Sequence, residues 1–223
     1  MKEYLRVCLT LIAIIVFISS CKKEEATTTM APPKDYSLSI KDKTYWGTLT
    51  NAGEGSQYYS VHFNANNTLL WSQLSNDYNG TWSIDKNKLT LTFTSPAVVV
   101  TATISDDNKL TAITTNTANK VNTGELVENA NIPLDGTVWK GGGNFNLTTP
   151  TALQFSFLAG SNVQTKVVAT TYAPGSYTRS ASGGSIRFYV PTVLAYVFCV
   201  ITSGEKMVGS YGNITFLWEM TKQ

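Results

Sequence analysis

Residues 80–93 read Gly-Thr-Trp-Ser-Ile-Asp-Lys-Asn-Lys-Leu-Thr-Leu-Thr-Phe and contain two short runs in which apolar and polar residues alternate. In the first run, Trp82 and Ile84 share one face. The second run also places its apolar residues on one face (Leu89, Leu91, Phe93). Asp85-Lys86-Asn87 supplies turn residues between them. Because a period of two is typical of half-buried strands, this stretch predicts a β-hairpin.

The same alternation extends to both sides of the hairpin. Polar corners at 64–67, 85–87 and 106–108 separate the runs. Connections this short join antiparallel neighbours, because a parallel crossover needs about a dozen residues or more. The strands predicted in the first half are 44–49, 57–63, 69–74, 80–84, 89–94, 98–104 and 110–114.

The second half of the chain repeats this order. Thr137-Val138-Trp139 echoes Thr44-Tyr45-Trp46, and Gly175-Ser176-Tyr177 echoes Gly80-Thr81-Trp82. The order of the matches predicts a duplication, with a first β repeat over 38–120, a linker over 121–134 and a second repeat over 135–223. A final run at 214–220 has no partner in the first repeat. Either the two repeats are not equivalent, or this run is a strand that closes a sheet shared by both.

The sequence therefore predicts an all-β fold of two tandem antiparallel meander repeats. Two small barrels, one joint barrel and a pair of stacked sandwiches all satisfy the pattern. Charged residues make up 14% of the chain, and Thr, Ser, Asn and Gly are abundant, which is typical of an extracytoplasmic β protein. The formal net charge is +2 and no basic stripe recurs, so no nucleic-acid partner is expected.

The N-terminus has the order of a bacterial export signal. Lys2 and Arg6 precede an apolar run at 7–18, which is shorter than the roughly 20 residues of a membrane-spanning helix. Ile-Ser-Ser-Cys at 18–21 follows, and this ending resembles the bacterial lipoprotein signal. The resemblance implies a signal peptide over 1–20, lipid attachment at Cys21 and membrane association through the acyl groups. The alternative is an ordinary secretory signal that happens to contain a cysteine.

Residues 21–37 lack apolar periodicity and contain Pro32-Pro33, which predicts a flexible tether. The Lys-Lys-Glu-Glu run at 22–25 resembles the surface-export signals of Bacteroidota lipoproteins, although those favour acidic residues. The expected location is the cell envelope, as an outer-membrane lipoprotein on either the periplasmic or the surface face.

The first repeat resembles the lipocalin-like lipoproteins of Bacteroidota. The resemblance rests on Trp46 near the first strand, the aromatic strand and Asn-rich turn at 59–69, and the hairpin at 80–93. It implies small antiparallel barrels or sandwiches. The chain departs from the Gly-x-Trp pattern of true lipocalins, because Thr44 stands in the glycine position and Gly136 lies one residue too early.

Few residues of the sequence suggest catalysis or metal binding. His62 is the single histidine, and no motif supplies it with a nucleophile or an acid. Cys199 lies in an apolar strand and is expected to be a small buried hydrophobe. One histidine and one cysteine do not make a structural zinc site, and Asp106-Asp107-Asn108 is better explained as a hairpin corner than as a calcium site. The chain is therefore expected to be a non-enzyme without a cofactor.

The aromatic residues are the remaining candidates for a binding role. Core packing is favoured for four of the tryptophans (Trp46, Trp82, Trp139, Trp218). Trp71 has no counterpart in the second repeat, so Trp71, Tyr58 and His62 are the candidate ligand-binding residues. The expected function is non-catalytic binding of an apolar small molecule or a glycan. The alternatives are a structural or partner-binding envelope component, whose protein partner is unknown, and a hydrolase with a loop-borne carboxylate pair.

Overall fold

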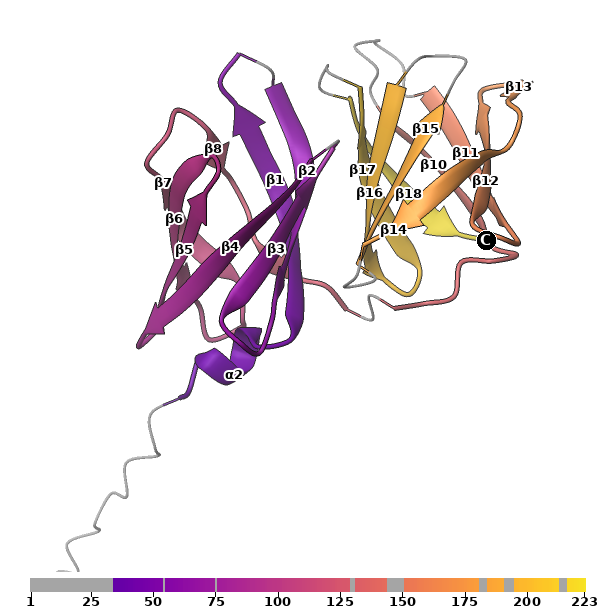
Figure 1. The fold of residues 1–223 in the computed structure, drawn as a ribbon. Helices are drawn as coiled ribbons and strands as arrows, with labels where there is room; N and C mark the ends of the chain where they lie inside the picture. The colour runs from indigo at the N-terminus through magenta and orange to yellow at the C-terminus, as the bar shows by residue number, and fades with distance from the viewer. Residues whose placement is uncertain are drawn as a thin grey trace, which may run out of the picture. The chain divides into compact units, whose positions relative to one another are not determined.

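The computed structural model describes residues 34–53, 55–74, 76–128, 131–143, 151–180, 184–190, 195–212 and 216–223. The predicted signal peptide at 1–20, Cys21 and the tether up to residue 33 lie outside the described residues. Residues Asp35–Gln223 form one compact unit. A single helical turn, α2 (Ser37–Ile40), precedes the strands within the described part of this unit, which confirms the prediction of an all-β fold with two tandem repeats (Figure 1).

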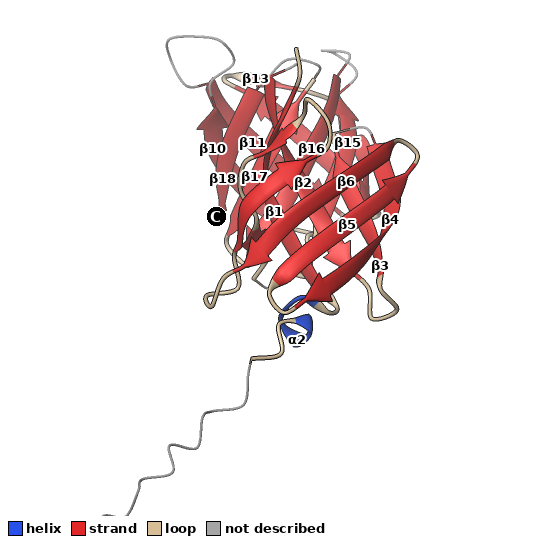
Figure 2. Cartoon of the chain, turned by 90° about the vertical axis from the view of Figure 1, so that its left-hand side faces the viewer, coloured by secondary structure: helices blue, strands red, loops and turns tan. Residues whose placement is uncertain are grey.

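The first sheet is an antiparallel meander in the order β7-β6-β5-β4-β3-β2-β1-β8, and β9 also pairs with β1. Figure 2 shows β6, β5 and β4 of this sheet side by side. At most of their ends, the observed strands are a few residues longer than the predicted strands. They are β1 (Lys43–Asn51), β2 (Gly55–Phe63), β3 (Thr68–Gln73), β4 (Asn76–Asp85), β5 (Lys88–Thr94), β6 (Ala97–Ile104), β7 (Leu110–Thr115), β8 (Lys120–Val121) and β9 (Glu125–Leu126).

The two ends of the first sheet meet and close a barrel. Strands β8 and β9 pair with the outer edge of β1. The Leu110 N–H in β7 donates to the Gly124 carbonyl at 2.8 Å, between β8 and β9. Part of the segment predicted as a linker over 121–134 therefore belongs to the first barrel. Closure leaves few unpaired backbone groups at a sheet edge, which is the physical advantage of a barrel.

The second sheet follows the order β11-β10-β18-β17-β16-β15-β14-β12-β13, and an additional pairing of β11 with β12 closes it. The last strand, β18, pairs with β10 and β17, so it completes the second barrel and not a shared sheet. The strands are β10 (Val138–Gly143), β11 (Thr151–Leu158), β12 (Asn162–Val167), β13 (Thr170–Thr171), β14 (Gly175–Arg179), β15 (Ser185–Val190), β16 (Ala195–Ser203), β17 (Lys206–Tyr211) and β18 (Phe216–Lys222).

Each barrel has its own apolar core. The hairpin at 80–93 contributes as its alternation predicts: Trp82 pairs with Leu91 across β4 and β5, and both side chains are buried in the first core. Trp139 and Trp218 are buried in the second core, which confirms their predicted packing role. Aromatic side chains bury large apolar areas, so these residues stabilise the barrels strongly.

Trp46 does not pack in the first core, so the prediction of a core role for it is wrong. Tyr45 is fully buried in the first core, so the next residue, Trp46, points to the opposite face of β1. There it packs against a third cluster that joins residues of both barrels (Tyr58, Val127, Phe198, Val200, Val208). Trp139 pairs with Phe155 as Tyr45 pairs with Val61. The residue equivalent to Trp139 is therefore Tyr45, and a shift of one residue reverses the face of a side chain.

Candidate functional site

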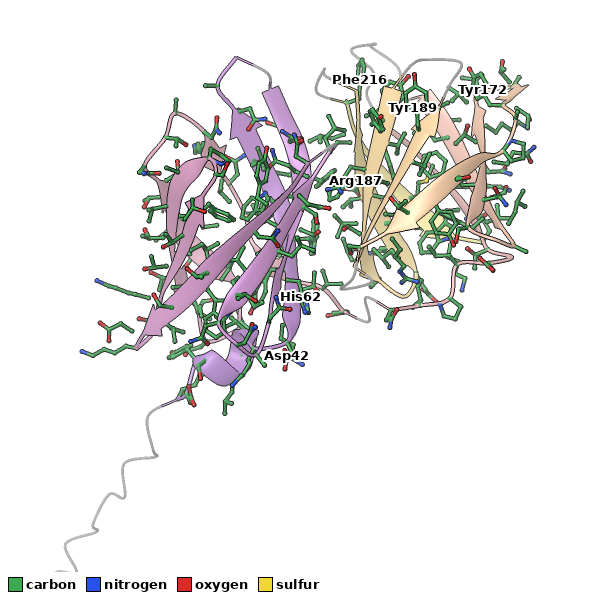
Figure 3. The ribbon with its side chains drawn as sticks, viewed as in Figure 1. Asp42, His62, Tyr172, Arg187, Tyr189 and Phe216 are labelled. Atoms are coloured by element: carbon green, nitrogen blue, oxygen red, sulfur yellow. The ribbon has the colours of Figure 1, made fainter. Side chains whose placement is uncertain are left out.

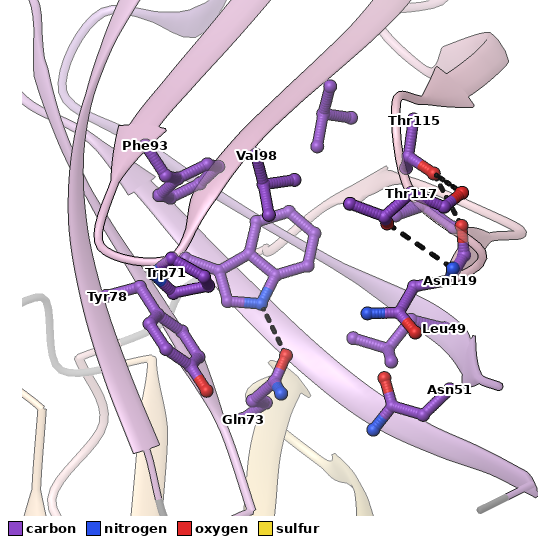
Figure 4. A pocket seen from close by; sticks show the side chains of 13 residues that line it. Leu49, Asn51, Trp71, Gln73, Tyr78, Phe93, Val98, Thr115, Thr117 and Asn119 are labelled. Atoms are coloured by element: carbon purple, nitrogen blue, oxygen red, sulfur yellow. Dashed lines mark hydrogen bonds between the residues drawn. The ribbon is translucent and has the colours of Figure 1, made fainter. Parts of the chain in front are cut away.

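The first barrel contains a cavity of about 100 Å³, shown in close-up in Figure 4. Its apolar wall consists of Leu49, Trp71, Tyr78, Phe93, Pro96, Val98, Val100 and Val121, and its polar lining consists of Asn51, Gln73, Thr115, Thr117 and Asn119. Among the described residues that line the cavity, none carries a charge. A neutral lining of this kind suits a neutral ligand, because a buried charge needs a partner.

Trp71 is the aromatic residue at the centre of this wall. Its indole stacks on the Tyr59 ring, with centroids 4.0 Å apart and planes at 5°. The Phe93 ring approaches the indole edge-on at 6.1 Å. The Trp71 Nε1 donates a hydrogen bond to Gln73 Oε1 at 2.9 Å (Figure 4). Two ring contacts and one hydrogen bond therefore hold the indole in one orientation.

Apart from Gln73 in β3, the polar lining comes from the end of β1, the end of β7 and the chain that follows β7. Thr115 Oγ1 donates to the carbonyl oxygens of Thr117 and Asn119. The Asn119 side-chain oxygen accepts a hydrogen bond from the Ala52 N–H at 3.2 Å, next to Asn51 in β1. These bonds connect two segments on one side of the cavity. The hydroxyl and amide groups of these segments therefore form the polar part of the cavity lining.

Arg187, labelled in Figure 3, lies in β15 of the second barrel and binds the end of β3, the start of β4 and Leu74 between them. Its guanidinium donates to the carbonyl oxygens of Gln73 at 3.1 Å, Leu74 at 2.9 Å and Asn76 at 2.7 Å. It also binds both carboxylate oxygens of Asp77, at 2.6 and 2.8 Å. The hydrogen bonds from Arg187 are the main reason that the pKa of Asp77 lies below its ordinary value, although burial opposes them.

Tyr58 lies away from the cavity. Its ring packs in the third cluster, 5.9 Å from the Trp46 ring, and its N–H donates to Ser210 Oγ at 2.7 Å. Loss of water around the phenol raises its pKa to about 12, with a smaller contribution from Glu219. Tyr58 is therefore a packing residue between the barrels.

His62 also lies outside the cavity, on the face of β2 opposite to Tyr59 and near Asp42 (Figure 3). Its Nδ1 lies 3.0 Å from Thr44 Oγ1. Partial burial lowers the pKa of His62, and the charge of Asp42 opposes this effect. Of the three ligand-binding candidates from the sequence, Trp71 lines the cavity, whereas Tyr58 and His62 do not.

Cys199 is fully buried in the second core, which confirms the prediction from its apolar surroundings. Burial raises the pKa of its thiol, so the reactive thiolate is disfavoured. Within the described ranges, no group of three or more His, Cys, Asp or Glu side chains is placed to hold a metal ion. The same part of the chain contains no helix long and apolar enough to cross a bilayer.

Sequence reasoning missed Gln73 and Arg187. Gln73 is placed two residues after Trp71 on the same face of β3, so strand alternation gave a signal that it shares the wall. Arg187 has no such signal, because it is 110 residues from Asp77 and no local pattern relates the two.

Comparison with known proteins identifies no family for this chain. No family model and no curated protein matches it. A solved structure of a protein of unknown function from the DUF3598 family of Nostoc punctiforme aligns with 86% of this chain and 99% of its own, at 12% identity and a TM-score of 0.27.

Proposed function

We propose that this chain is a lipid-anchored protein of the bacterial cell envelope whose first barrel binds a neutral, amphipathic small molecule without catalysing a reaction on it. The cavity beside Trp71 carries the proposal, because it combines an apolar wall with an uncharged polar lining. Ligand sites in proteins commonly have this composition, with a few polar groups that orient a mostly apolar ligand.

The size of the cavity favours a small apolar molecule over a glycan. A cavity of roughly 150 Å³ holds one benzene ring, and this cavity is about 100 Å³. It therefore suits the terminal carbons of an alkyl chain, while the rest of the ligand, with its polar end, lies along the amide and hydroxyl groups of the lining. One face of the Trp71 indole is already covered by Tyr59. That face of the indole is therefore not available for stacking with a sugar ring.

Binding can be tested with 1-octanol as a neutral amphiphilic probe. We expect native mass spectrometry and isothermal titration calorimetry of the purified chain to detect saturable binding of one octanol molecule. Val98→Trp should abolish binding, because Val98 lines the cavity and the larger ring would fill it. Val99→Trp is the matched control, since the next residue of a strand points to the other face.

Equal octanol binding by the wild-type chain and the Val98→Trp variant would contradict the assignment of this cavity. Absence of octanol binding, together with absence of any neutral small molecule that co-purifies with the chain, would contradict the binding function itself. Circular dichroism of both tryptophan variants checks that the barrels remain folded.

The proposed anchor rests on the lipoprotein-like order of residues before Cys21. Two or more acyl chains hold a protein firmly at a membrane, because each buried methylene contributes about 0.8 kcal/mol. We expect Cys21→Ser to abolish incorporation of labelled palmitate and to release the protein from the membrane fraction. Unchanged labelling and unchanged membrane retention would show that Cys21 is not the attachment point.

A further inference from the structure

The second barrel contains a larger cavity, of about 190 Å³. It is lined by residues of β11, β12, β15, β16, β17 and β18, together with Tyr172 (Figure 3). The described residues around it are apolar except for the hydroxyl groups of one threonine and two tyrosines, and none is charged. Protein interiors contain few voids larger than a water molecule, so a cavity of this size is a distinctive feature of the second barrel.

Strand registers show that this cavity occupies the same place in its barrel as the first cavity does. In the first barrel, Val61 of β2 pairs with Trp71 of β3. In the second barrel, Phe155 of β11 pairs with Thr165 of β12. Val61 and Phe155 are equivalent, because each also pairs with the inward-facing aromatic residue of the preceding strand. Thr165 therefore stands where the first barrel has Trp71.

A second pair of strands gives the same correspondence independently. Val100 of β6 pairs with Thr115 of β7, and both residues line the first cavity. Val197 of β16 pairs with Tyr211 of β17, and both residues line the second cavity. Two separate ladders thus place the two cavities at equivalent positions.

The exchange of Trp71 for Thr165 explains the difference in size. In the first barrel an indole occupies this position and forms part of the wall. In the second barrel Thr165 is 4% exposed and leaves the corresponding space open. Two residues further along β12, Val167 lines the second cavity where Gln73 lines the first, so one amide group is also replaced by an apolar one.

We propose that the second barrel carries a second binding site, for one neutral, apolar, single-ring molecule that occupies the space left by Thr165. The volume fits this class of ligand, since an apolar cavity of roughly 150 Å³ stays dry and binds benzene. The site is distinct from the one in the first barrel, and it does not depend on the function proposed for that barrel. The second cavity is larger than the first and has a less polar lining.

Benzene is the probe for this site, and the chain without its leader is the sample, because Asp35–Gln223 form a compact unit. We expect benzene to shift the methyl resonances of Val167, Val190 and Val197 saturably in carbon-13 methyl NMR spectra. Thr165→Trp should weaken benzene binding by roughly tenfold or more, because it restores the aromatic residue of the first barrel. Thr165→Val removes the hydroxyl but keeps the side chain about the same size, so it leaves the cavity open and should bind benzene within about threefold of the wild type.

Two further variants keep the result interpretable. If Thr165→Trp does not fold, Val190→Phe narrows the same cavity from β15 and should weaken binding in the same way. Trp71→Phe, in the first barrel, should leave the benzene-induced shifts of Val167, Val190 and Val197 unchanged. The proposal is overturned if benzene does not shift these three methyl groups, or if neither cavity-filling variant weakens its binding. It is also overturned if Trp71→Phe removes the shifts.

Discussion

The indole of Trp71 lies parallel to the ring of Tyr59, with centroids 4.0 Å apart. The two residues are on neighbouring strands, β2 and β3, and both side chains face the interior of the first barrel. The Tyr59 hydroxyl donates to the Thr123 carbonyl at 2.6 Å, so the stacked pair is fixed from that side as well. The stack therefore holds Trp71, the member of the pair that lines the cavity, in a fixed orientation.

Removal of the Trp71 ring should therefore affect both stability and binding. Trp71→Ala is expected to lower the free energy of unfolding by about 3–5 kcal/mol, because it deletes a large buried ring and leaves a cavity. Trp71→Phe should cost less, since it keeps a ring against Tyr59. Urea unfolding at constant pH measures both effects. A loss below about 1 kcal/mol for Trp71→Ala would show that the ring contributes little to packing.

Arg187 should couple the second barrel to the end of β3, where Gln73 lies. Arg187→Ala is expected to lower the free energy of unfolding by about 2 kcal/mol, because hydrogen bonds to charged groups contribute more than neutral ones. Arg187→Lys keeps the charge but loses the planar fork that binds both Asp77 oxygens. We expect Arg187→Lys to recover less than half of the lost stability in urea unfolding. Full recovery would mean that charge alone matters here.

Arg187→Ala should also weaken octanol binding in the first barrel, since the Gln73 carbonyl loses its partner from β15. Calorimetric titration of the folded variant measures this change. Unchanged affinity would restrict Arg187 to a role in stability. Lys88→Ala, at an exposed position of the first barrel, is a suitable control.

His62 should make stability depend on pH in a defined direction. Its pKa in the fold is below the ordinary value of 6.5, so the unfolded chain binds a proton at a higher pH than the folded chain does. Its contribution is therefore fully present above about pH 6.5 and is lost as the pH falls from there through the folded pKa. Because the chain has a single histidine, His62→Gln should flatten this part of the stability profile. Chemical denaturation between pH 7.5 and 5 measures the slope.

A steeper loss of stability at low pH in His62→Gln than in the wild type would contradict this assignment. A proton NMR titration of the His62 ring gives its pKa directly. A pKa above 6.5 would reverse the predicted sign.

A side chain at Gly209 should destabilise the second barrel. Gly209 pairs with Trp218 in the ladder between β17 and β18, and a Cβ at this position would overlap the Trp218 indole. The indole in turn packs edge-on against Phe155 at 5.1 Å, so it has little room to move. We expect Gly209→Ala to lower the free energy of unfolding by about 1–3 kcal/mol in urea.

Gly175→Ala is the comparison for this prediction, because the nearest atom to its added Cβ is the Tyr189 carbonyl oxygen at 3.1 Å. It should cost less than Gly209→Ala. Equal losses in the two variants would mean that the ring overlap at Gly209 is relieved by a small shift of Trp218.

Much of the architecture is predictable from local patterns in the chain. Alternation at 80–93 predicts the hairpin because a strand sends successive side chains to opposite faces, and the short corners predict antiparallel pairing. The repeated order of these patterns also predicts the duplication. The choice of two separate barrels required the structure, because closure depends on contacts such as Leu110 with Gly124 and β11 with β12.

The sites depended on tertiary structure for the same reason. Trp71 is recognisable in the sequence as a tryptophan with no match in the second repeat. Tyr58 and His62 lie on the face of β2 opposite to Tyr59, so they do not line the cavity. The match of Trp139 with Trp46 failed because a one-residue offset reverses the face of a strand residue. Local alternation sets which way a side chain points. Which residues then meet, as Arg187 and Asp77 do, is decided by the packing of strands that lie far apart in the chain.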